Sequence, residues 1–226
     1  SKTLLVNQLR AEVDKWRNSG YQKPSGISRT SLRLLEWWFD ETHFFNDSTP
    51  FKYYFAQREA IETIIYLYEV KKLRDAADLA FQYMDPSAYR SDLFETRKKI
   101  EETARNERVL TRIVPETGLV AQQELPAPDH VRYAVKMATG SGKTLVMAMT
   151  IVWSFFHRKF ENNLELSKNF LIIAPNVIVF ERLREDFENG KIFNEWDLVP
   201  SVWKHEWSGM TFILRGETRK SSTEGT

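Results

Sequence analysis

A turn of small residues ending in Gly-Lys-Thr is the stretch of this sequence with the clearest chemistry. It runs Met137-Ala138-Thr139-Gly140-Ser141-Gly142-Lys143-Thr144, between a strand-like run and a helix-like run. In a phosphate-binding P-loop, backbone N–H groups at a helix N-terminus cradle the phosphates, and the helix dipole favours their negative charge. By that chemistry Lys143 reaches the β- and γ-phosphates and the Thr144 hydroxyl ligates Mg²⁺. Position one of the strict pattern is Met137 instead of glycine, so the identification depends on the flanking elements.

The flanking elements predict an α/β arrangement for the second half of the chain. Residues 131–137 place apolar side chains at every second position, which indicates a strand entering the loop. Residues 143–160 form a helix that is apolar on nearly all sides and must be buried against a sheet. Residues 170–174 are an unbroken apolar run typical of a central parallel strand, and a helix follows over 177–187. This order is the start of a doubly wound sheet.

The first half of the chain is predicted to be mainly helical. Apolar residues at helical spacing indicate helices over residues 3–16 and 31–39, and a third helix with a broad apolar face over 57–68. A fourth helix is expected over residues 73–83. In the third helix, Gln57 on its own would be interpreted as a surface or capping residue.

Charge and turn residues then suggest where the chain divides. Residues 91–112 alternate in charge, which is typical of a solvated helix face, and residues 115–129 are rich in proline and indicate a linker. We therefore predict an N-terminal helical segment over 1–50, a helical segment with insertion and linker over 51–130, and an α/β domain over 131–226.

The last part of the chain is less regular. Residues 210–214 are expected to form another strand. The tryptophans at 196, 203 and 207 are assigned to core or interface packing instead of base stacking, because no basic cluster accompanies them.

Two short patterns resemble catalytic motifs but lie in the wrong context. Asp40-Glu41-Thr42-His43 has the form of a helicase D-E-x-H box, which follows the P-loop at the end of a buried strand. Here the pattern precedes the P-loop and follows a predicted helix, so we interpret it as a helix end. Glu69-Val70-Lys71 fits the E-x-K element of a nuclease, but that element requires a strand and this run is predicted to be helical.

The composition sets limits on possible functions. The chain has 226 residues, 42% of them hydrophobic, which suffices for a packed core. Its net charge of +1 predicts no bulk attraction to nucleic acid or to membranes. It has no cysteine, which excludes disulfides and thiolate metal sites and suits the reducing cytoplasm. No apolar run reaches the roughly 18 residues of a membrane span. We therefore expect a cytoplasmic protein without a membrane partner.

Three motifs together resemble those of superfamily 2 helicases and translocases. The Met-Ala-Thr-Gly form of residues 137–144 is most similar to the type I and type III restriction-enzyme motor subunits. Phe55-Ala56-Gln57-Arg58-Glu59-Ala60 resembles the Q-type motif of the family, whose glutamine contacts adenine. The resemblance therefore implies a nucleotide site made of Gln57, Arg58, Thr139, Gly140, Ser141, Gly142, Lys143 and Thr144. Within it, Lys143 and Thr144 are the catalytic candidates, with Thr144 on the Mg²⁺.

A third motif implies a surface for nucleic acid. Ile173-Ala174-Pro175-Asn176, together with Glu181-Arg182-Leu183, resembles motif Ia, which contacts the nucleic-acid backbone. From this resemblance we expect Pro175, Asn176 and Arg182 to contact DNA.

The resemblance implies a partial RecA-like P-loop NTPase with a parallel sheet and a helical N-terminal portion. It implies ATP and Mg²⁺ as cofactors, double-stranded DNA as substrate, and possible association with a DNA methyltransferase subunit. No acidic D-E box follows the P-loop, which predicts the N-terminal fragment of a larger motor with little ATP turnover of its own. Two alternatives remain: another P-loop NTPase or kinase, and a non-catalytic module that docks a methyltransferase or nuclease.

Overall fold

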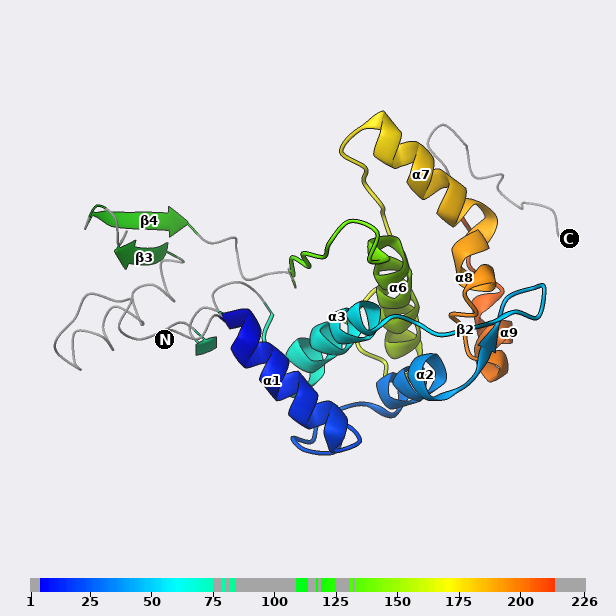
Figure 1. Cartoon of the computed structure of the whole chain (residues 1–226), viewed down its shortest axis with the longest axis horizontal. Coiled ribbons are helices and arrows are strands. Elements are labelled where there is room, and N and C mark those ends of the chain that lie inside the picture. Colours follow the sequence, from blue (N-terminus) through cyan, green and yellow to red (C-terminus); the bar gives the residue numbers. More distant parts are fainter. Residues whose placement is uncertain are drawn as a thin grey trace, which may run out of the picture. The chain divides into compact units, whose positions relative to one another are not determined.

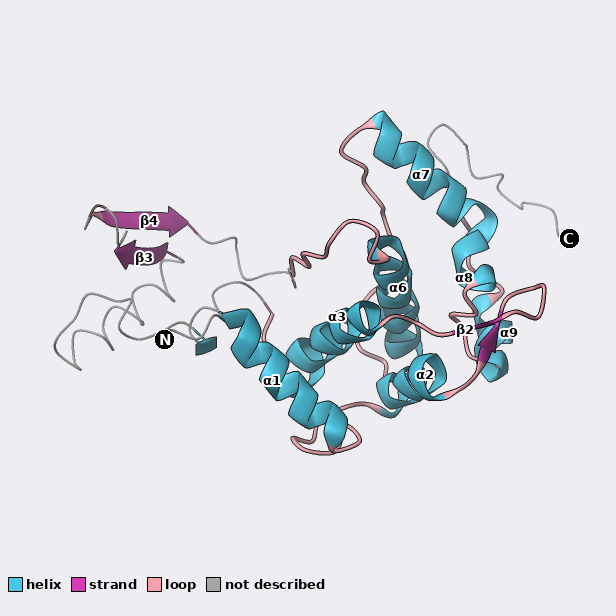
Figure 2. Cartoon of the chain, in the orientation of Figure 1, coloured by secondary structure: helices cyan, strands magenta, loops and turns pink. Residues whose placement is uncertain are grey.

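The computed structural model describes residues 5–74, 79, 82–83, 109–113, 117, 119–124, 131 and 133–213. The chain divides into two compact units. Unit 1 comprises Ser1–Ile27 and Glu62–Lys136, and unit 2 comprises Ser28–Ile61 and Met137–Thr226. Within the described ranges most of the regular structure is helical, and the strands occur as short pairs (Figure 1; Figure 2). None of the described helices is long and apolar enough to cross a membrane.

Unit 1 is built on helix α1 (Leu5–Asn18), which confirms the first predicted helix. Its buried face carries Leu9, Val13 and Trp16, and the Trp16 ring lies 5.2 Å from the ring of Tyr66. Tyr66 begins η1 (Tyr66–Val70), a short π-helix that continues from α3 (Phe55–Ile65). Glu69 and Val70 are therefore helical, as predicted against the nuclease interpretation.

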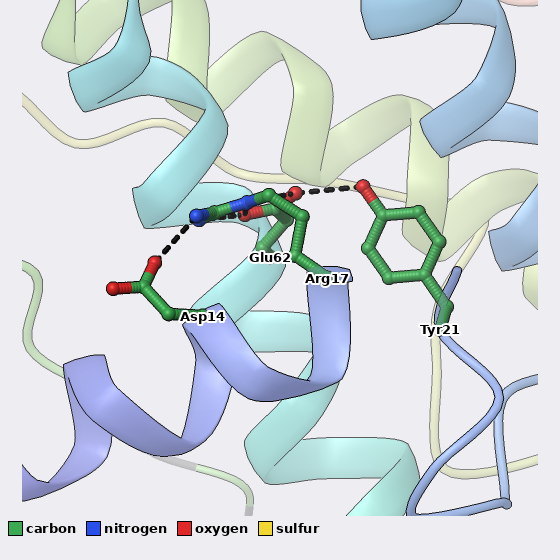
Figure 3. A network of polar contacts seen from close by, with 4 residues as sticks. All are labelled: Asp14, Arg17, Tyr21 and Glu62. Atoms are coloured by element: carbon green, nitrogen blue, oxygen red, sulfur yellow. Dashed lines mark hydrogen bonds and ion pairs between the residues drawn. The ribbon is translucent and has the colours of Figure 1, made fainter. Parts of the chain in front are cut away.

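A buried carboxylate, that of Glu62, ties α1 to the second half of α3 (Figure 3). The Glu62 side chain is 0% exposed, and its carboxylate accepts hydrogen bonds from Arg17 Nε at 2.8 and 3.0 Å. It also accepts one from the Tyr21 hydroxyl at 2.7 Å, while Arg17 donates to Asp14 as well. Burying a charge is costly unless it is paired with an opposite charge and hydrogen-bonded. Arg17 provides the opposite charge for Glu62, and Arg17 and Tyr21 provide the hydrogen bonds.

An antiparallel hairpin corrects two predictions for the middle of the chain. Strand β3 (Val109–Ile113) pairs with β4 (Val120–Glu124), with Val109 opposite Glu124 and Ile113 opposite Val120. The end of the supposed helical charge run and part of the supposed linker are thus strands. Val, Ile and Thr fit a pleated surface, and cross-strand pairing outweighed the charge alternation on which the helix prediction rested. The charged residues 91–108 lie outside the described residues.

Unit 2 is organised by two helices that pack on each other. Helix α2 (Arg29–Asp40) and helix α6 (Lys143–Phe160) confirm the predicted helices at these places. The buried side chains of this pair are mainly large and apolar: Leu34, Leu35, Trp38, Met149, Val152, Trp153 and Phe156. Because α2 ends at Asp40, the Asp-Glu-Thr-His pattern is a helix end, as predicted.

Polar contacts fix the start of α2 against the far end of α6. Ser28 caps α2 by accepting from the Ser31 N–H, and the Ser31 hydroxyl accepts from Trp153 Nε1 at 2.7 Å. At the end of α6, a Glu161 carboxylate oxygen accepts from the Thr30 N–H at 3.1 Å and from its hydroxyl at 2.7 Å. These bonds satisfy backbone donors that a helix N-terminus leaves unpaired.

Short elements complete unit 2. After α7 (Val177–Phe187), which matches its prediction, the chain forms the elements η3 (Glu188–Gly190), α8 (Lys191–Glu195), η4 (Ser201–Trp203) and α9 (Lys204–Trp207). Trp203 and Trp207 pack against other aromatic rings: the ring of Trp203 lies 4.8 Å from Phe156 and that of Trp207 lies 5.1 Å from Phe155. Trp207 is buried in the core, as predicted, whereas Trp203 is half-buried.

A small aromatic cluster joins α2 to the segment after α8. Strand β1 (His43–Phe44) pairs antiparallel with β2 (Pro50–Phe51), a pair that no pattern in the sequence indicated. Trp37 and Trp38 donate from their indole nitrogens to the carbonyls of residues 197 and 198, both at 2.8 Å. The ring of Trp196 lies 5.4 Å from that of Phe51.

The predicted parallel sheet is not confirmed. Residues 133–137, 170–174 and 210–213 have no regular secondary structure, although strands were expected there. The described sheets are the two antiparallel pairs β1–β2 and β3–β4. A parallel strand is stable only between neighbouring strands and under helices on both faces. The described residues provide no such neighbours, and Leu171 is accordingly 84% exposed.

Candidate functional site

The P-loop lies at the start of α6, which is the position that the sequence predicts. Gly140 and Gly142 have φ values of +79° and +85°, a left-handed conformation that glycine adopts without strain. Gly142 is the N-cap of α6 and provides no side-chain cap. The first N–H groups of α6 thus have no capping side chain and are available to an anion.

Buried apolar residues hold this helix start in place. Leu145 and Val146, in the first turn of α6, are both 4% exposed, and further along the helix Met149 is fully buried. The burial of these side chains fixes the direction of α6 and hence the direction in which its first N–H groups point.

The Lys143 side chain folds back over its own loop. Its ammonium donates hydrogen bonds to the carbonyl oxygens of Met137 at 3.1 Å and Ala138 at 2.9 Å. The Ser141 hydroxyl donates to the same Ala138 oxygen at 2.7 Å. Lys143 remains exposed, so its ammonium is within reach of a ligand in solution.

Gln57 lies against the P-loop although the two are far apart in the sequence. Its side chain is 3% exposed, and its Nε2 donates to the Ser141 carbonyl oxygen at 3.5 Å, across 84 residues. A Cβ on Gly142 would come within 2.2 Å of that nitrogen. Another residue at 142 would therefore be strained in its backbone and would also displace the end of the Gln57 side chain.

The first turn of α3 orients the Gln57 amide. Gln57 Oε1 accepts from the Tyr54 backbone N–H at 2.9 Å, which is the reach-back of a capping box at the helix start. Gln57 is thus a capping residue, and the cap directs its amide nitrogen toward the P-loop. The interpretation of Gln57 as a capping residue and its assignment to the nucleotide site are compatible.

The remaining candidates are distributed around unit 2. Arg58 is half-buried, and its guanidinium lies 4.9 Å from the centre of the Phe39 ring. Thr139 is exposed on the loop, and Thr144 is half-buried in the first turn of α6. Among these, the structure brings Gln57 to the P-loop, whereas it places Arg58 against α2.

The candidates for DNA contact lie at α7. The Asn176 side chain caps this helix by accepting from the Val179 N–H at 3.0 Å. Pro175 precedes it and is exposed, and Arg182, six residues after Asn176, is also exposed. Within the described residues, no hydrogen bond or ion pair joins these three residues to the P-loop.

The hydrogen-bond donors of the P-loop suit a phosphate group. An uncapped helix start, two left-handed glycines and an exposed ammonium are the groups that bind phosphate in P-loops. For a metal ion, the described residues contain no cluster of three or more His, Asp or Glu side chains. Thr144, the Mg²⁺ candidate from the sequence, lies half-buried in the first turn of α6, next to Lys143.

Some residues that build the site were not identified from the sequence. Tyr54 orients Gln57 through its backbone N–H, and Ser31, Thr30 and Glu161 fix α6 to α2. The Ser-x-x-Ser spacing at the start of α2 was a capping pattern that could have been recognised. No local pattern could have indicated the contact between Thr30 and Glu161, which lie 131 residues apart.

Comparison with known proteins identifies the family. Comparisons with curated proteins and with solved structures gave no significant match. The family described as "Type III restriction enzyme, res subunit" matches residues 51–208, which is more than half of the chain. The matched segment includes Gln57, the P-loop and α7, and the family is a RecA-like P-loop domain of the helicase type. This chain belongs to the family of type III restriction enzyme res subunits.

Proposed function

We propose that this chain supplies the ATP-binding part of a DNA helicase or translocase of the restriction-enzyme type. In the full-length protein, ATP hydrolysis would drive movement along double-stranded DNA. The observation that carries the proposal is the contact of Gln57 with the P-loop at Ser141 and Gly142. A P-loop alone indicates a nucleotide phosphate, whereas a buried glutamine beside it is what the resemblance to a Q-type motif implies.

Each candidate residue has a proposed role at this site. The backbone N–H groups of residues 139–144 surround the phosphates, and Lys143 leaves its two carbonyl acceptors to contact the β- and γ-phosphates. Thr144 holds Mg²⁺, and Gln57 with Arg58 lies on the adenine side. Catalysis of phosphoryl transfer is mainly positioning and charge stabilisation, which is what Lys143 and Thr144 provide. Pro175, Asn176 and Arg182 are proposed to contact the DNA backbone, and a DNA methyltransferase is the proposed protein partner.

The test is nucleotide binding by calorimetry with ATP and Mg²⁺. Replacing Lys143 with Ala removes a charge-assisted contact worth about 1.5–3 kcal/mol, so affinity should fall roughly ten- to a hundredfold. Lys136→Ala is the matched control, because Lys136 is an exposed lysine just before the loop. This control should bind nucleotide as tightly as the parent chain.

Two results would contradict the proposal. Equal affinities of the parent chain and Lys143→Ala would show that the loop does not bind the phosphates. A protein partner that binds with the same affinity with and without nucleotide, to a chain that itself binds no ATP, would favour the non-catalytic module.

A further inference from the structure

The histidine that ends the Asp-Glu-Thr-His pattern is buried, and the proposed nucleotide site gives it no role. His43 lies in β1 and is 1% exposed. Its Nε2 lies 2.7 Å from the carbonyl oxygen of Trp37 in α2, and its Nδ1 lies 3.1 Å from a carboxylate oxygen of Asp197. The Trp37 indole nitrogen in turn donates to the Asp197 carbonyl oxygen at 2.8 Å. His43 therefore bridges α2 and the segment that follows α8.

Both ring nitrogens of His43 face hydrogen-bond acceptors. A carbonyl oxygen and an ionised carboxylate accept but do not donate, and a neutral imidazole has only one N–H group. The ionised form of Asp197 is favoured by the Lys204 ammonium, which lies 3.2 Å from its other carboxylate oxygen. Only the imidazolium form of His43, with two N–H groups, satisfies both contacts.

The surroundings of His43 also suit a positive charge. The Phe51 ring stacks on it with centroids 5.4 Å apart, a distance at which an aromatic face attracts a cation. The Tyr53 ring lies 5.3 Å away, and burial together with the negative charge of Asp197 raises the pKa of its hydroxyl, which keeps Tyr53 neutral. The charged and titratable groups that face His43 or its two partners are Asp197, Tyr53, Lys204 and Arg33, whose guanidinium lies 5.9 Å from the centre of the Trp37 ring.

His43 holds the stretch of chain that leads into α3. It lies opposite Phe51 in the β1–β2 pair. Two residues after Phe51, the Tyr53 hydroxyl donates to the carbonyl oxygen of Trp196, which is next to Asp197 in the sequence. The hairpin and the residues after it are therefore attached to the same segment by two side chains.

This stretch ends at the glutamine that contacts the P-loop. The Tyr54 backbone N–H donates to Gln57 Oε1 at 2.9 Å, and Gln57 Nε2 donates to the Ser141 carbonyl oxygen at 3.5 Å. A shift of residues 51–54 would therefore move the N–H group that orients the Gln57 amide.

We propose that His43, in its imidazolium form, is a positioning residue for Gln57, so that loss of its proton weakens nucleotide binding. This role rests on the proposed function, because it requires nucleotide at the P-loop. Histidine generally titrates between about pH 5 and 8. As pH rises, one ring N–H is lost, and either Trp37 or Asp197 loses its donor. The contribution of the bridge to stability is therefore present at low pH and is lost as pH rises.

The first experiment measures the ionisation of His43 directly. In a nitrogen-15 labelled chain, the ring nitrogen shifts distinguish an imidazolium from a neutral imidazole. The chain has four histidines, and the signals of His43 are those that His43→Gln lacks. At about pH 6 both nitrogens of His43 should carry a proton, and one proton should be lost as pH is raised toward about 9.

The second experiment measures ATP affinity by calorimetry at several pH values for the parent chain, His43→Gln and Asp197→Asn. The φ of Asp197 is +44°, and asparagine tolerates this left-handed conformation as aspartate does, so Asp197→Asn should keep the fold. Each variant should bind ATP several-fold more weakly than the parent chain at about pH 6, and this ratio should approach one as pH rises. Ionisation of ATP itself is common to all chains and does not affect the ratio.

The matched control is His205→Gln, because His205 is an exposed histidine of the same unit. It should have the affinity and the pH profile of the parent chain. Circular dichroism verifies the fold of each variant. If His43→Gln does not fold, Asp197→Asn provides both the assignment of the His43 signals and the affinity ratio.

The outcomes separate this inference from the proposed function. A parent chain that binds no ATP would overturn the proposed function and the positioning role with it, whereas the nitrogen shifts would still show whether the charged bridge exists. In a chain that binds ATP, a neutral His43 at about pH 6 would overturn the inference alone. An affinity ratio that does not change with pH would do the same, because it would indicate a purely structural role.

Discussion

At the scale of single residues, the P-loop is shaped by what surrounds Gly142. Gly140 and Gly142 have nearly the same left-handed φ, but their surroundings differ. A Cβ at 140 would meet no atom within 4 Å, whereas a Cβ at 142 would lie 2.2 Å from Gln57 Nε2. Substituting Gly140 would therefore test the strain of the left-handed backbone alone, whereas substituting Gly142 would test that strain together with the contact with Gln57.

This pair gives a prediction about stability. Gly140→Ala should cost about 1–2 kcal/mol in the free energy of unfolding, since only the left-handed backbone is strained. Gly142→Ala should cost more, because Gln57 must also move, and nucleotide affinity should fall with it. Urea denaturation of both variants measures the difference. Adding Gln57→Ala to Gly142→Ala should recover part of the loss, and equal costs for the two glycines would contradict the observed contact.

At the scale of elements, charged side chains hold α1 in unit 1. Glu62 accepts from Arg17 and Tyr21 in a fully buried position, and Glu12 accepts from Lys71 at 2.8 Å and from Tyr66 at 3.0 Å. The first carboxylate is shielded from water and the second is partly exposed. Their loss should therefore have different consequences.

Removing the buried carboxylate should be strongly destabilising. Glu62→Ala leaves the half-buried Arg17 guanidinium and the buried Tyr21 hydroxyl without their shared carboxylate, and the expected cost is roughly 3–5 kcal/mol of unfolding free energy. Glu41→Ala is the comparison, because Glu41 pairs with Arg33 at 2.7 Å on the surface and should cost no more than about 1 kcal/mol. Denaturant titrations of both variants test this, and similar costs would show that the Arg17–Glu62 pair is not effectively buried.

Glu12 should make the stability of the protein sensitive to acid. Partial burial opposes ionisation of its carboxyl group, but hydrogen bonds from Lys71, Tyr83 and Tyr66 outweigh burial and lower its pKa below 4.5. A lowered folded-state pKa stabilises the protein above the unfolded pKa, and this contribution is lost as pH falls through the folded value.

The variant Glu12→Gln should therefore lose stability near neutral pH and differ little from the parent at pH 3. Thermal unfolding at several pH values measures the gap between the two chains. Glu36→Gln is the control, because the half-exposed Glu36 carboxylate comes no closer than 3.9 Å to Arg33, and it should show little of this gap. A gap for Glu12→Gln that does not narrow in acid would contradict the role of its ionised form.

Sequence patterns predicted the helices, because a helix is determined largely by residues within it and at its ends. The apolar faces of α1, α6 and α7, together with their capping and turn residues, located these helices closely. The predictions that failed concern strands, which depend on pairing with other segments. Residues 170–174 have the composition of a strand, but a strand exists only with partners, and β3–β4 formed where partners lay nearby in sequence. For the site, motif order suggested that Gln57 and Gly142 belong together, whereas the packing that brings them into contact depends on the whole of unit 2.

At the scale of the whole molecule, the charge balance bears on DNA binding. A net charge of +1 gives no long-range attraction, so binding would depend on a few local contacts. On α7, Arg184 is paired with Glu181 at 2.9 Å, whereas the described residues give the exposed Arg182 no ion pair. Arg182 is therefore the arginine of this helix that is available to a phosphate.

Binding of duplex DNA should accordingly weaken with salt, with a shallow slope. Each phosphate contact contributes about −0.9 to the slope of log affinity against log salt concentration. Arg182→Ala should reduce the slope by about one, whereas Arg184→Ala should change it less. Fluorescence anisotropy between 50 and 200 mM salt, a range over which such contacts are measurable, makes the comparison. Equal effects of the two substitutions on the salt dependence would show that Arg182 is not a specific contact of the proposed DNA surface.

The position of the Lys143 ammonium on the carbonyls of Met137 and Ala138 has a consequence for the time course of binding. The side chain that meets the phosphate first has to leave its own loop. If that release precedes binding, the observed rate in a rapid-mixing experiment levels off at high nucleotide concentration at the rate of release. Lys143→Ala has nothing to release, so its weaker binding should show a rate that keeps rising with concentration.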